Sequence, residues 1–156
     1  VALAKPYMVE NARVLDPFCG VGTLLIERQK ELKADTSYGI DISEEALQKA
    51  SLNTNEAEQL IHYIHRDFES FTHEYPFDEI FTDLPFAMGA SSQDEIRRIY
   101  KDFFAHSKSL LSKTGTIICY ARNPEYCTRF AKENGYRIVK EFVISEKEDT
   151  RLFVIK

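Results

Sequence analysis

The chain has 156 residues, of which 44% are hydrophobic and 29% are charged, and its formal net charge is −5. This length suits one ordinary domain with a real core, so we expect a single domain over residues 1–156. The composition is typical of a soluble globular protein. Since an acidic chain has no general attraction for phosphate backbones, a nucleic-acid partner would have to be bound locally or by another domain.

The cysteines and the apolar runs bear on the cellular location of the protein and on whether it holds disulfides or a metal. Cys19, Cys119 and Cys127 lie far apart without C-x-x-C spacing, which argues against both a disulfide framework and a zinc site. No apolar run approaches the roughly 20 residues of a membrane helix, and no signal peptide is visible. We therefore expect a cytoplasmic protein without a metal site and, because its first residue is Val1, a fragment.

Strand-like and helix-like segments alternate along the whole chain. The apolar periodicity predicts strands at 12–16, 37–42, 61–67, 78–84 and 114–121, and helices at 23–33, 43–57, 92–112 and 124–134. Two further strands, 136–145 and 150–156, predict an antiparallel hairpin. The fold class is therefore α/β: a doubly wound, mostly parallel sheet with a C-terminal antiparallel hairpin.

Two of these helices carry recognisable signals at their ends. Ser43 is the expected N-cap of the second helix, and Asn123 followed by Pro124 is the expected start of the fourth. Gly135 is placed to end that fourth helix.

Each of the first four strands delivers an aspartate at or just after its end: Asp16, Asp41, Asp67 and Asp83. Ligands of such sheets collect at the carboxyl ends of the strands. Several carboxylates at one edge would form an acceptor-rich crevice that suits hydroxyl and amino donors or positive charge. A triphosphate would bind there poorly.

The first strand runs into the stretch DPFCGVGT (16–23), whose glycines raise two phosphate-binding alternatives. No lysine follows the glycines, so the stretch fails as a phosphate loop. Leu25 occupies the third small position of a dinucleotide fingerprint, so that match is only partial. Asp41 nevertheless lies about twenty residues past Gly20, where a carboxylate holds ribose hydroxyls, so the ligand is expected to contain a ribose.

DPFCGVGT resembles the D-P-x-C-G-x-G-T cofactor loop of class I S-adenosylmethionine-dependent methyltransferases, which have a Rossmann-like sheet. The resemblance implies that Asp16 binds the cofactor ammonium, that Gly20 and Gly22 let the backbone approach, that Asp41 binds the ribose and that Asp67 with Phe68 meets the adenine. The implied cofactor-binding residues are Asp16, Phe18, Cys19, Gly20, Gly22, Thr23, Asp41, Ile42, Asp67 and Phe68.

The fourth strand ends in TDLPFAMG (82–89), which resembles the [DNS]-[LP]-P-[FYW] motif of methyltransferases that act on planar amino or amide nitrogens. Such a nitrogen is a weak nucleophile because its lone pair is delocalised. Asp83 and the Leu84 carbonyl would accept its hydrogens, Pro85 would fix the turn, and Phe86 would stack on the flat acceptor. These four residues are the predicted catalytic set.

The two motifs together are similar to those of RNA guanine methyltransferases that carry an upstream THUMP domain, including tRNA-modifying enzymes. The resemblance implies methylation of a guanine exocyclic amine in tRNA or rRNA, with RNA bound mainly through the missing upstream domain. It departs at Ala87-Met88, which separate Phe86 from the glycine that relatives place directly after the aromatic residue.

Several alternatives stay open. The acceptor could instead be an adenine amino group or a protein glutamine amide, because D-L-P-F does not separate these. A domain of another class would be an inactive scaffold or RNA-binding partner, which the intact acceptor motif disfavours. Asp67 is also explained as a simple helix cap, and Cys19 as a packing residue inside its loop, with no base in view to make it a nucleophile.

Overall fold

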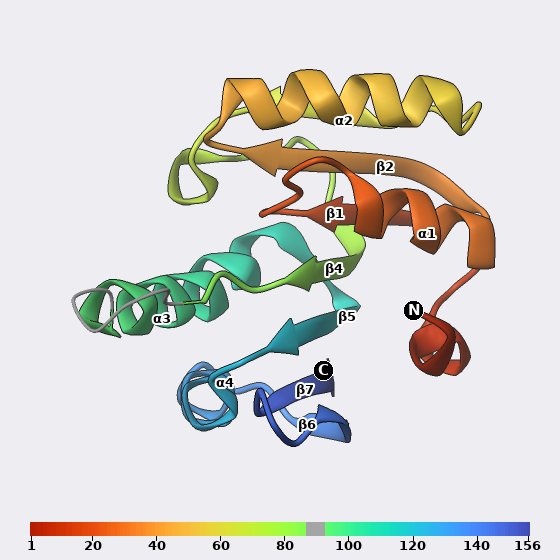
Figure 1. Ribbon diagram of the computed structural model, residues 1–156. Helices are drawn as coiled ribbons and strands as arrows, with labels where there is room; N and C mark the ends of the chain where they lie inside the picture. Colours follow the sequence, from red (N-terminus) through yellow and green to blue (C-terminus); the bar gives the residue numbers. More distant parts are fainter. Residues whose placement is uncertain (87–92) are drawn as a thin grey trace.

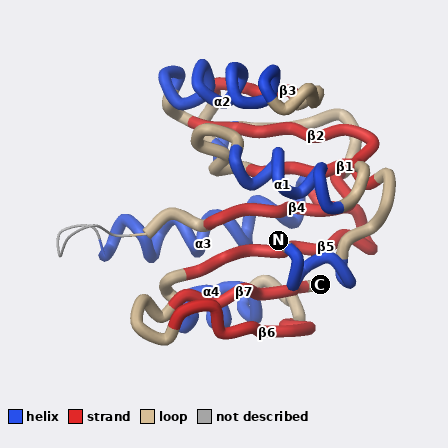
Figure 2. Tube along the Cα trace, turned by 45° about the vertical axis from the view of Figure 1, so that its right-hand side comes forward, coloured by secondary structure: helices blue, strands red, loops and turns tan. Residues whose placement is uncertain are grey.

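The computed structural model of the chain describes residues 1–86 and 93–156. Within them one seven-stranded sheet has the order β3-β2-β1-β4-β5-β7-β6, which Figure 2 follows from top to bottom. The strands are β1 Ala12–Asp16, β2 Ala34–Asp41, β3 His62–His65, β4 Phe77–Asp83, β5 Leu111–Ala121, β6 Ile138–Ser145 and β7 Thr150–Ile155. The first five are parallel to one another, and β7 is antiparallel to both β5 and β6.

In the described residues four α-helices and one short 3₁₀-helix connect the strands, and another 3₁₀-helix precedes β1 (Figure 1). The α-helices are α1 Thr23–Glu31, α2 Glu44–Glu56, α3 Gln93–Leu110 and α4 Pro124–Glu133, and the 3₁₀-helices are η1 Ala2–Tyr7 and η2 Phe68–Ser70. The predicted fold class is confirmed, because helices alternate with the parallel strands and an antiparallel hairpin follows them.

Two apolar clusters fill the space on the two faces of the sheet. One joins Leu15 and Ile80 of the sheet to aromatic side chains of η2, α3 and α4 such as Phe68 and Phe103. The other joins Val14 and neighbouring strands to η1, α1 and α2. Successive residues of β1 thus enter different cores, as the alternation of side chains along a strand requires.

The predicted boundaries agree with the structure except at a few ends. β2 and β5 begin three residues earlier than predicted, and residue 92 of the third predicted helix lies outside the described residues. Ser43 caps α2 by accepting a hydrogen bond from the Ala46 N–H, as predicted. Gly135 follows α4 with a φ of +79°, the left-handed conformation that glycine adopts without strain.

Asn123 occupies the N-cap position of α4 and Pro124 the first position of the helix, as predicted. Asn123 precedes the helix, but its side chain makes no capping hydrogen bond. Pro124 at the first turn lacks an N–H, so α4 begins with one orphan donor fewer. The proline therefore explains the start of this helix better than the asparagine does.

A buried ion pair fixes α1 to the beginning of β4. The Arg28 guanidinium donates to both carboxylate oxygens of Glu79, at 2.7 and 3.1 Å, and also to the backbone carbonyl of Val9. Both side chains are almost fully buried. Burial raises the pKa of Glu79 and the hydrogen bonds from Arg28 oppose that rise, so this pair supplies its own counter-charge inside the core.

No helix in residues 1–86 and 93–156 is long and apolar enough to cross a membrane.

Candidate active site

The carboxyl ends of the parallel strands meet at one edge of the sheet and bring the predicted aspartates together. Asp16 ends β1 opposite Gly39 of β2, and Asp41 ends β2 opposite His65 of β3. Asp83 ends β4 opposite Tyr120 of β5. In Figure 1 the arrowheads of β1, β2 and β4 all point to this edge.

Asp16 is buried beneath the loop that follows it, with 1% of its surface exposed. Its Oδ1 accepts hydrogen bonds from the Thr82 hydroxyl at 2.6 Å and the Phe18 N–H at 3.0 Å. Burial raises the pKa of Asp16 to about 7, against the lowering effect of these two hydrogen bonds. No lysine or arginine of the described residues bonds to it, so its negative charge is uncompensated inside the chain.

The glycine turn between β1 and α1 uses its two glycines differently. Gly20 and Gly22 have φ values of +52° and +86°, in the left-handed region. A side chain at Gly22 would collide with the Tyr63 hydroxyl, whereas a Cβ at Gly20 would meet no atom within 4 Å. Packing within the chain thus requires glycine at position 22, and position 20 faces open space where a ligand backbone or chain can approach.

Asp41 joins the glycine turn to the start of α2. Its Oδ2 accepts from the Gly20 N–H and its Oδ1 from the Ser43 N–H, each at 2.9 Å. The next residue, Ile42, leaves 72% of its surface exposed. A carboxylate with oxygens still able to accept hydroxyl donors, beside an exposed apolar side chain, suits a ribose joined to a flat base.

The predicted adenine contacts divide between the surface and the core. Asp67 is exposed and caps η2 by accepting from the Glu69 N–H at 3.1 Å. Phe68 is buried, and its ring packs against those of Phe18 and Phe103 with centroids 5.7 and 5.8 Å apart. The side chain of Phe68 therefore shapes the core beneath this edge, and Asp67 is the member of the pair that reaches solvent.

The remaining two residues of the loop occupy different surroundings. Cys19 is buried, and burial raises the pKa of its thiol well above the usual range, which agrees with packing and not with a nucleophilic thiolate. Thr23 is exposed at the first position of α1.

The segment Asp83–Phe86 leaves the sheet directly beside Asp16. The Leu84 N–H donates to the Tyr120 carbonyl at 3.0 Å, and the Leu84 side chain is buried. The Asp83 side chain is open to solvent, but partial burial of its carboxyl raises its pKa, while the positive charge of Arg122 lowers it. Pro85 is half-buried, and Phe86 leaves 37% of its surface exposed. Ala87 and Met88, where the motif departs from its relatives, lie outside the described residues.

A cavity of about 470 Å³ opens beside Asp83. It lies between the start of α1, the ends of β4 and β5, and the turn that joins β6 to β7. The polar side chains that line it are Thr23, Glu27, Asp83, Tyr120, Arg122, Ser145, Glu148 and Thr150. Val1, Leu24 and Ile144 add apolar surface to the lining, so the cavity suits a flat molecule with hydrogen-bond donors at its rim, and it is large enough for a nucleobase.

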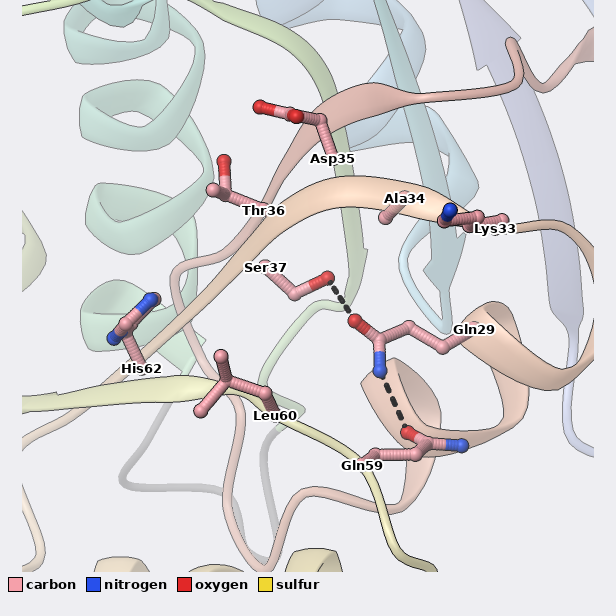
Figure 3. Close-up of a pocket in the computed structure, with 9 residues that line it drawn as sticks. All are labelled: Gln29, Lys33, Ala34, Asp35, Thr36, Ser37, Gln59, Leu60 and His62. Atoms are coloured by element: carbon pink, nitrogen blue, oxygen red, sulfur yellow. Dashed lines mark hydrogen bonds between the residues drawn. The ribbon is translucent and has the colours of Figure 1, made fainter.

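A second cavity, of about 280 Å³, lies near the opposite edge of the sheet, where β2 begins (Figure 3). In it Gln29 links its neighbours: it accepts from the Ser37 hydroxyl and donates to the Gln59 side chain, each at 2.8 Å. These polar groups satisfy one another, and none of the predicted site residues lies there.

Sequence reasoning did not find three residues that organise this edge: Thr82, Tyr63 and Arg122. Thr82 hydrogen-bonds Asp16, Tyr63 fills the space above Gly22, and Arg122 approaches Asp83. Only Thr82 lies within one of the two motif stretches, as the first residue of TDLPFAMG, where the motif gives it no role. No group of three or more His, Cys, Asp and Glu side chains arranged to hold a metal occurs among residues 1–86 and 93–156.

Comparison with known proteins gives a consistent result. Residues 7–150 match the family model described as RMKL-like, methyltransferase domain. Over 122 residues the chain is 34% identical to the tRNA (guanine(10)-N2)-dimethyltransferase of Methanothermobacter thermautotrophicus, covering 73% of this chain and 33% of that protein. The chain thus spans about a third of the length of this curated relative.

Solved structures share the fold. TrmN from Thermus thermophilus superposes with a TM-score of 0.85 at 23% identity, covering 99% of this chain and 47% of TrmN. The ribosomal protein L11 methylase of Lactobacillus delbrueckii subsp. bulgaricus gives a TM-score of 0.81 at 20% identity, covering 99% of this chain and 75% of that one. The family match confirms the predicted enzyme class and, with it, S-adenosylmethionine as the methyl donor. The chain belongs to the RMKL-like methyltransferase-domain family, within the class I S-adenosylmethionine-dependent methyltransferases.

Proposed function

We propose that this chain is the catalytic domain of an enzyme that methylates the exocyclic amine of a guanine in RNA, with tRNA as the favoured substrate over rRNA. The observation that carries this proposal is the position of Asp83: it ends β4 beside the glycine turn and lines a cavity large enough for a nucleobase. The 34% identity to a protein named as a tRNA guanine-N2-dimethyltransferase supports the choice of base and RNA.

The donor set at the carboxyl edge fits the proposed cofactor. S-Adenosylmethionine, when bound, supplies an electrophilic methyl group, and it carries an ammonium group and a ribose that need acceptors. Asp16 would accept from the ammonium, Asp41 from the ribose hydroxyls, and Asp67 from the adenine amino group. Gly20 faces open space, so the turn leaves room for the amino-acid portion. Ile42 would cover the adenine.

Asp83 is suited to assist a weak nitrogen nucleophile. Its carboxylate would accept one hydrogen of the guanine amine and orient the nitrogen lone pair toward the methyl group. Methyl transfer would exchange the S–C bond of the donor for an N–C bond and leave the nitrogen positive, and Asp83 would stabilise that charge and take the released proton. Because partial burial raises the pKa of Asp83, the carboxylate is a stronger base than an ordinary aspartate. The Leu84 carbonyl would accept the second hydrogen.

The RNA would be held mainly by a part of the protein outside this sequence. The net charge of −5 and the acidic side chains around the cavity, Glu27, Asp83 and Glu148, disfavour binding of a polyanion by this domain alone. We propose that residues 1–156 form one domain of a longer cytoplasmic enzyme whose RNA-binding domain lies upstream.

The direct test is a methyl-transfer assay with the full-length protein, labelled S-adenosylmethionine and unmodified tRNA. Mass spectrometry of the tRNA nucleosides then identifies the product. We expect N2-methylated guanosine. Asp83→Asn should lower kcat by about 10²- to 10³-fold, with the melting temperature unchanged. Asp35→Asn, an exposed aspartate at the opposite edge of the sheet, is the matched control and should leave kcat within twofold.

The products separate the alternatives. N6-Methyladenosine in the RNA would show that the acceptor is adenine, and methylated glutamine in a protein would show that it is a glutamine amide. Either result would contradict guanine as the acceptor and leave the cofactor unchanged. Failure of the folded chain to bind S-adenosylmethionine in a calorimetric titration would overturn the enzyme proposal and favour a scaffold.

A further inference from the structure

Arg122 stands between the predicted stacking residue and the cavity. It follows β5 directly, and its Cζ lies 3.7 Å from the centroid of the Phe86 ring. Among the described residues, those lining the cavity beside Asp83 include Arg122 but not Phe86. The guanidinium therefore covers a face of the Phe86 ring and is itself the group that borders the cavity.

The donors of Arg122 are free in the described part of the chain. No hydrogen bond or ion pair joins Arg122 to residues 1–86 or 93–156, although it is half-buried. It also lines a neighbouring cavity of about 320 Å³ at the start of α4. It is the one lysine or arginine among the described lining residues of both cavities, whose charged side chains are otherwise acidic.

A guanidinium that lies on an aromatic ring has two useful properties. Its plane is already fixed by the ring beneath it, and its second face can stack on another flat group. Bases drawn out of an RNA strand are stacked on such guanidinium planes as well as on aromatic rings.

We infer that Arg122, supported from behind by Phe86, is the surface on which the acceptor base lies, and that it thereby positions the base against Asp83. This inference rests on the proposed function and deepens it: Phe86 holds the guanidinium against one face of its ring. Stacking of this kind would take place after the RNA has docked, when the base enters the cavity.

The inference makes lysine and arginine unequal at position 122. Lysine keeps the positive charge but has no planar group to stack. If stacking is the contribution, Arg122→Lys and Arg122→Gln should both lower kcat by about tenfold. Because docking precedes stacking, the KM for RNA should stay within twofold in both variants.

The experiment compares the full chain, as it is encoded, with Arg122→Lys, Arg122→Gln and Phe86→Leu in steady-state methylation of unmodified tRNA. Phe86→Leu should give a partial loss of kcat, since leucine supports the guanidinium less firmly than a ring. Arg129→Lys is the matched control: Arg129 also lies over a phenylalanine ring, with its Cζ 5.1 Å from the centroid of Phe130, but on α4 away from Asp83. It should leave kcat unchanged.

Three outcomes would overturn the inference. Wild-type kcat in Arg122→Lys would show that charge alone suffices. A rise in the KM for RNA that appears in Arg122→Gln and is spared in Arg122→Lys would assign Arg122 to an RNA phosphate. An unchanged kcat in every Arg122 variant would leave the residue no role.

Calorimetric affinity for S-adenosylmethionine and the melting temperature should match the wild type in all variants, which excludes a merely structural effect. Absence of methylation by the wild-type chain itself would count against the proposed function and not against Arg122.

Discussion

Two buried carboxylates on neighbouring strands of the same sheet differ in whether the chain supplies a positive charge beside them. Glu79, near the start of β4, accepts two hydrogen bonds from the Arg28 guanidinium, one at each carboxylate oxygen. Asp16, at the end of β1, receives only a hydroxyl and a backbone N–H, and burial raises its pKa to about 7. A counter-charge built into the chain indicates a structural role. A buried acid without one, at the edge where ligands bind, indicates that a cationic ligand supplies the counter-charge.

Breaking the compensated pair should have the largest effect on stability. Arg28→Met leaves Glu79 buried without its partner, so we expect the free energy of unfolding to fall by about 3–5 kcal/mol, measured by urea denaturation. Lys30→Met, which removes an exposed partner of Glu27 at 3.2 Å, should cost less than about 1 kcal/mol. A loss below 1 kcal/mol in Arg28→Met would contradict the role given to the pair.

Removing the uncompensated charge should stabilise the ligand-free protein at high pH. The pKa of Asp16 is raised from 3.8 to about 7 on folding, so the folded state binds this proton more tightly than the unfolded state. The wild type should therefore lose stability as pH rises from about 4 to 7, by up to about 4 kcal/mol.

Asp16→Asn removes this titration and can still accept from Thr82 and Phe18. The difference in melting temperature between Asp16→Asn and the wild type should therefore increase as the pH is raised from 4 to 7, and should stay constant above pH 7. A constant difference across this range would show that Asp16 is not the group that titrates.

The same substitution should weaken the binding of S-adenosylmethionine. Loss of a charge-assisted hydrogen bond to the ammonium predicts an affinity about ten- to a hundredfold lower at pH 8, measured by calorimetry. The wild-type affinity should itself fall as pH drops below about 7, because the proton on Asp16 must leave first. Asp16→Asn should show no such dependence, and equal affinities at pH 8 would move the ammonium contact to another residue.

The two glycines of the turn show the same contrast between a structural role and a ligand-binding role, with smaller expected effects on stability. Gly22→Ala meets the Tyr63 hydroxyl and should destabilise the fold by about 1–3 kcal/mol. Gly20→Ala meets open space and should cost about 1 kcal/mol, from its left-handed φ alone, but should lower cofactor affinity. Thermal denaturation and calorimetry on both variants check this, and Gly22→Ala with Tyr63→Phe should recover part of the stability. If Gly20→Ala bound the cofactor normally, that glycine would not face the ligand.

Local signals explain which features could be predicted from the sequence. The Ser43 cap, the turn at Gly20 and the aspartates at the strand ends depend on neighbouring residues and on the alternation of strands and helices, which the sequence displays directly. The burial of Asp16 and its hydrogen bond to Thr82 depend on two strands 66 positions apart meeting in one register. The Arg122 contact with Phe86 likewise joins segments that are distant in the sequence, and nothing in either segment alone indicates it.

The position of β7 also has a consequence for how the protein is made. β7 lies between β5 and β6, and Leu152 through Ile155 are fully buried there. During synthesis, β5 and β6 leave the ribosome before β7, the strand that pairs with both of them. Neither can complete its pairing until residues 150–155 have also left the exit tunnel. Until then β5 presents an open apolar edge, the kind of surface that pairs with other nascent chains. Pairing of β7 therefore both closes the edge of β5 and gives β6 its place in the sheet.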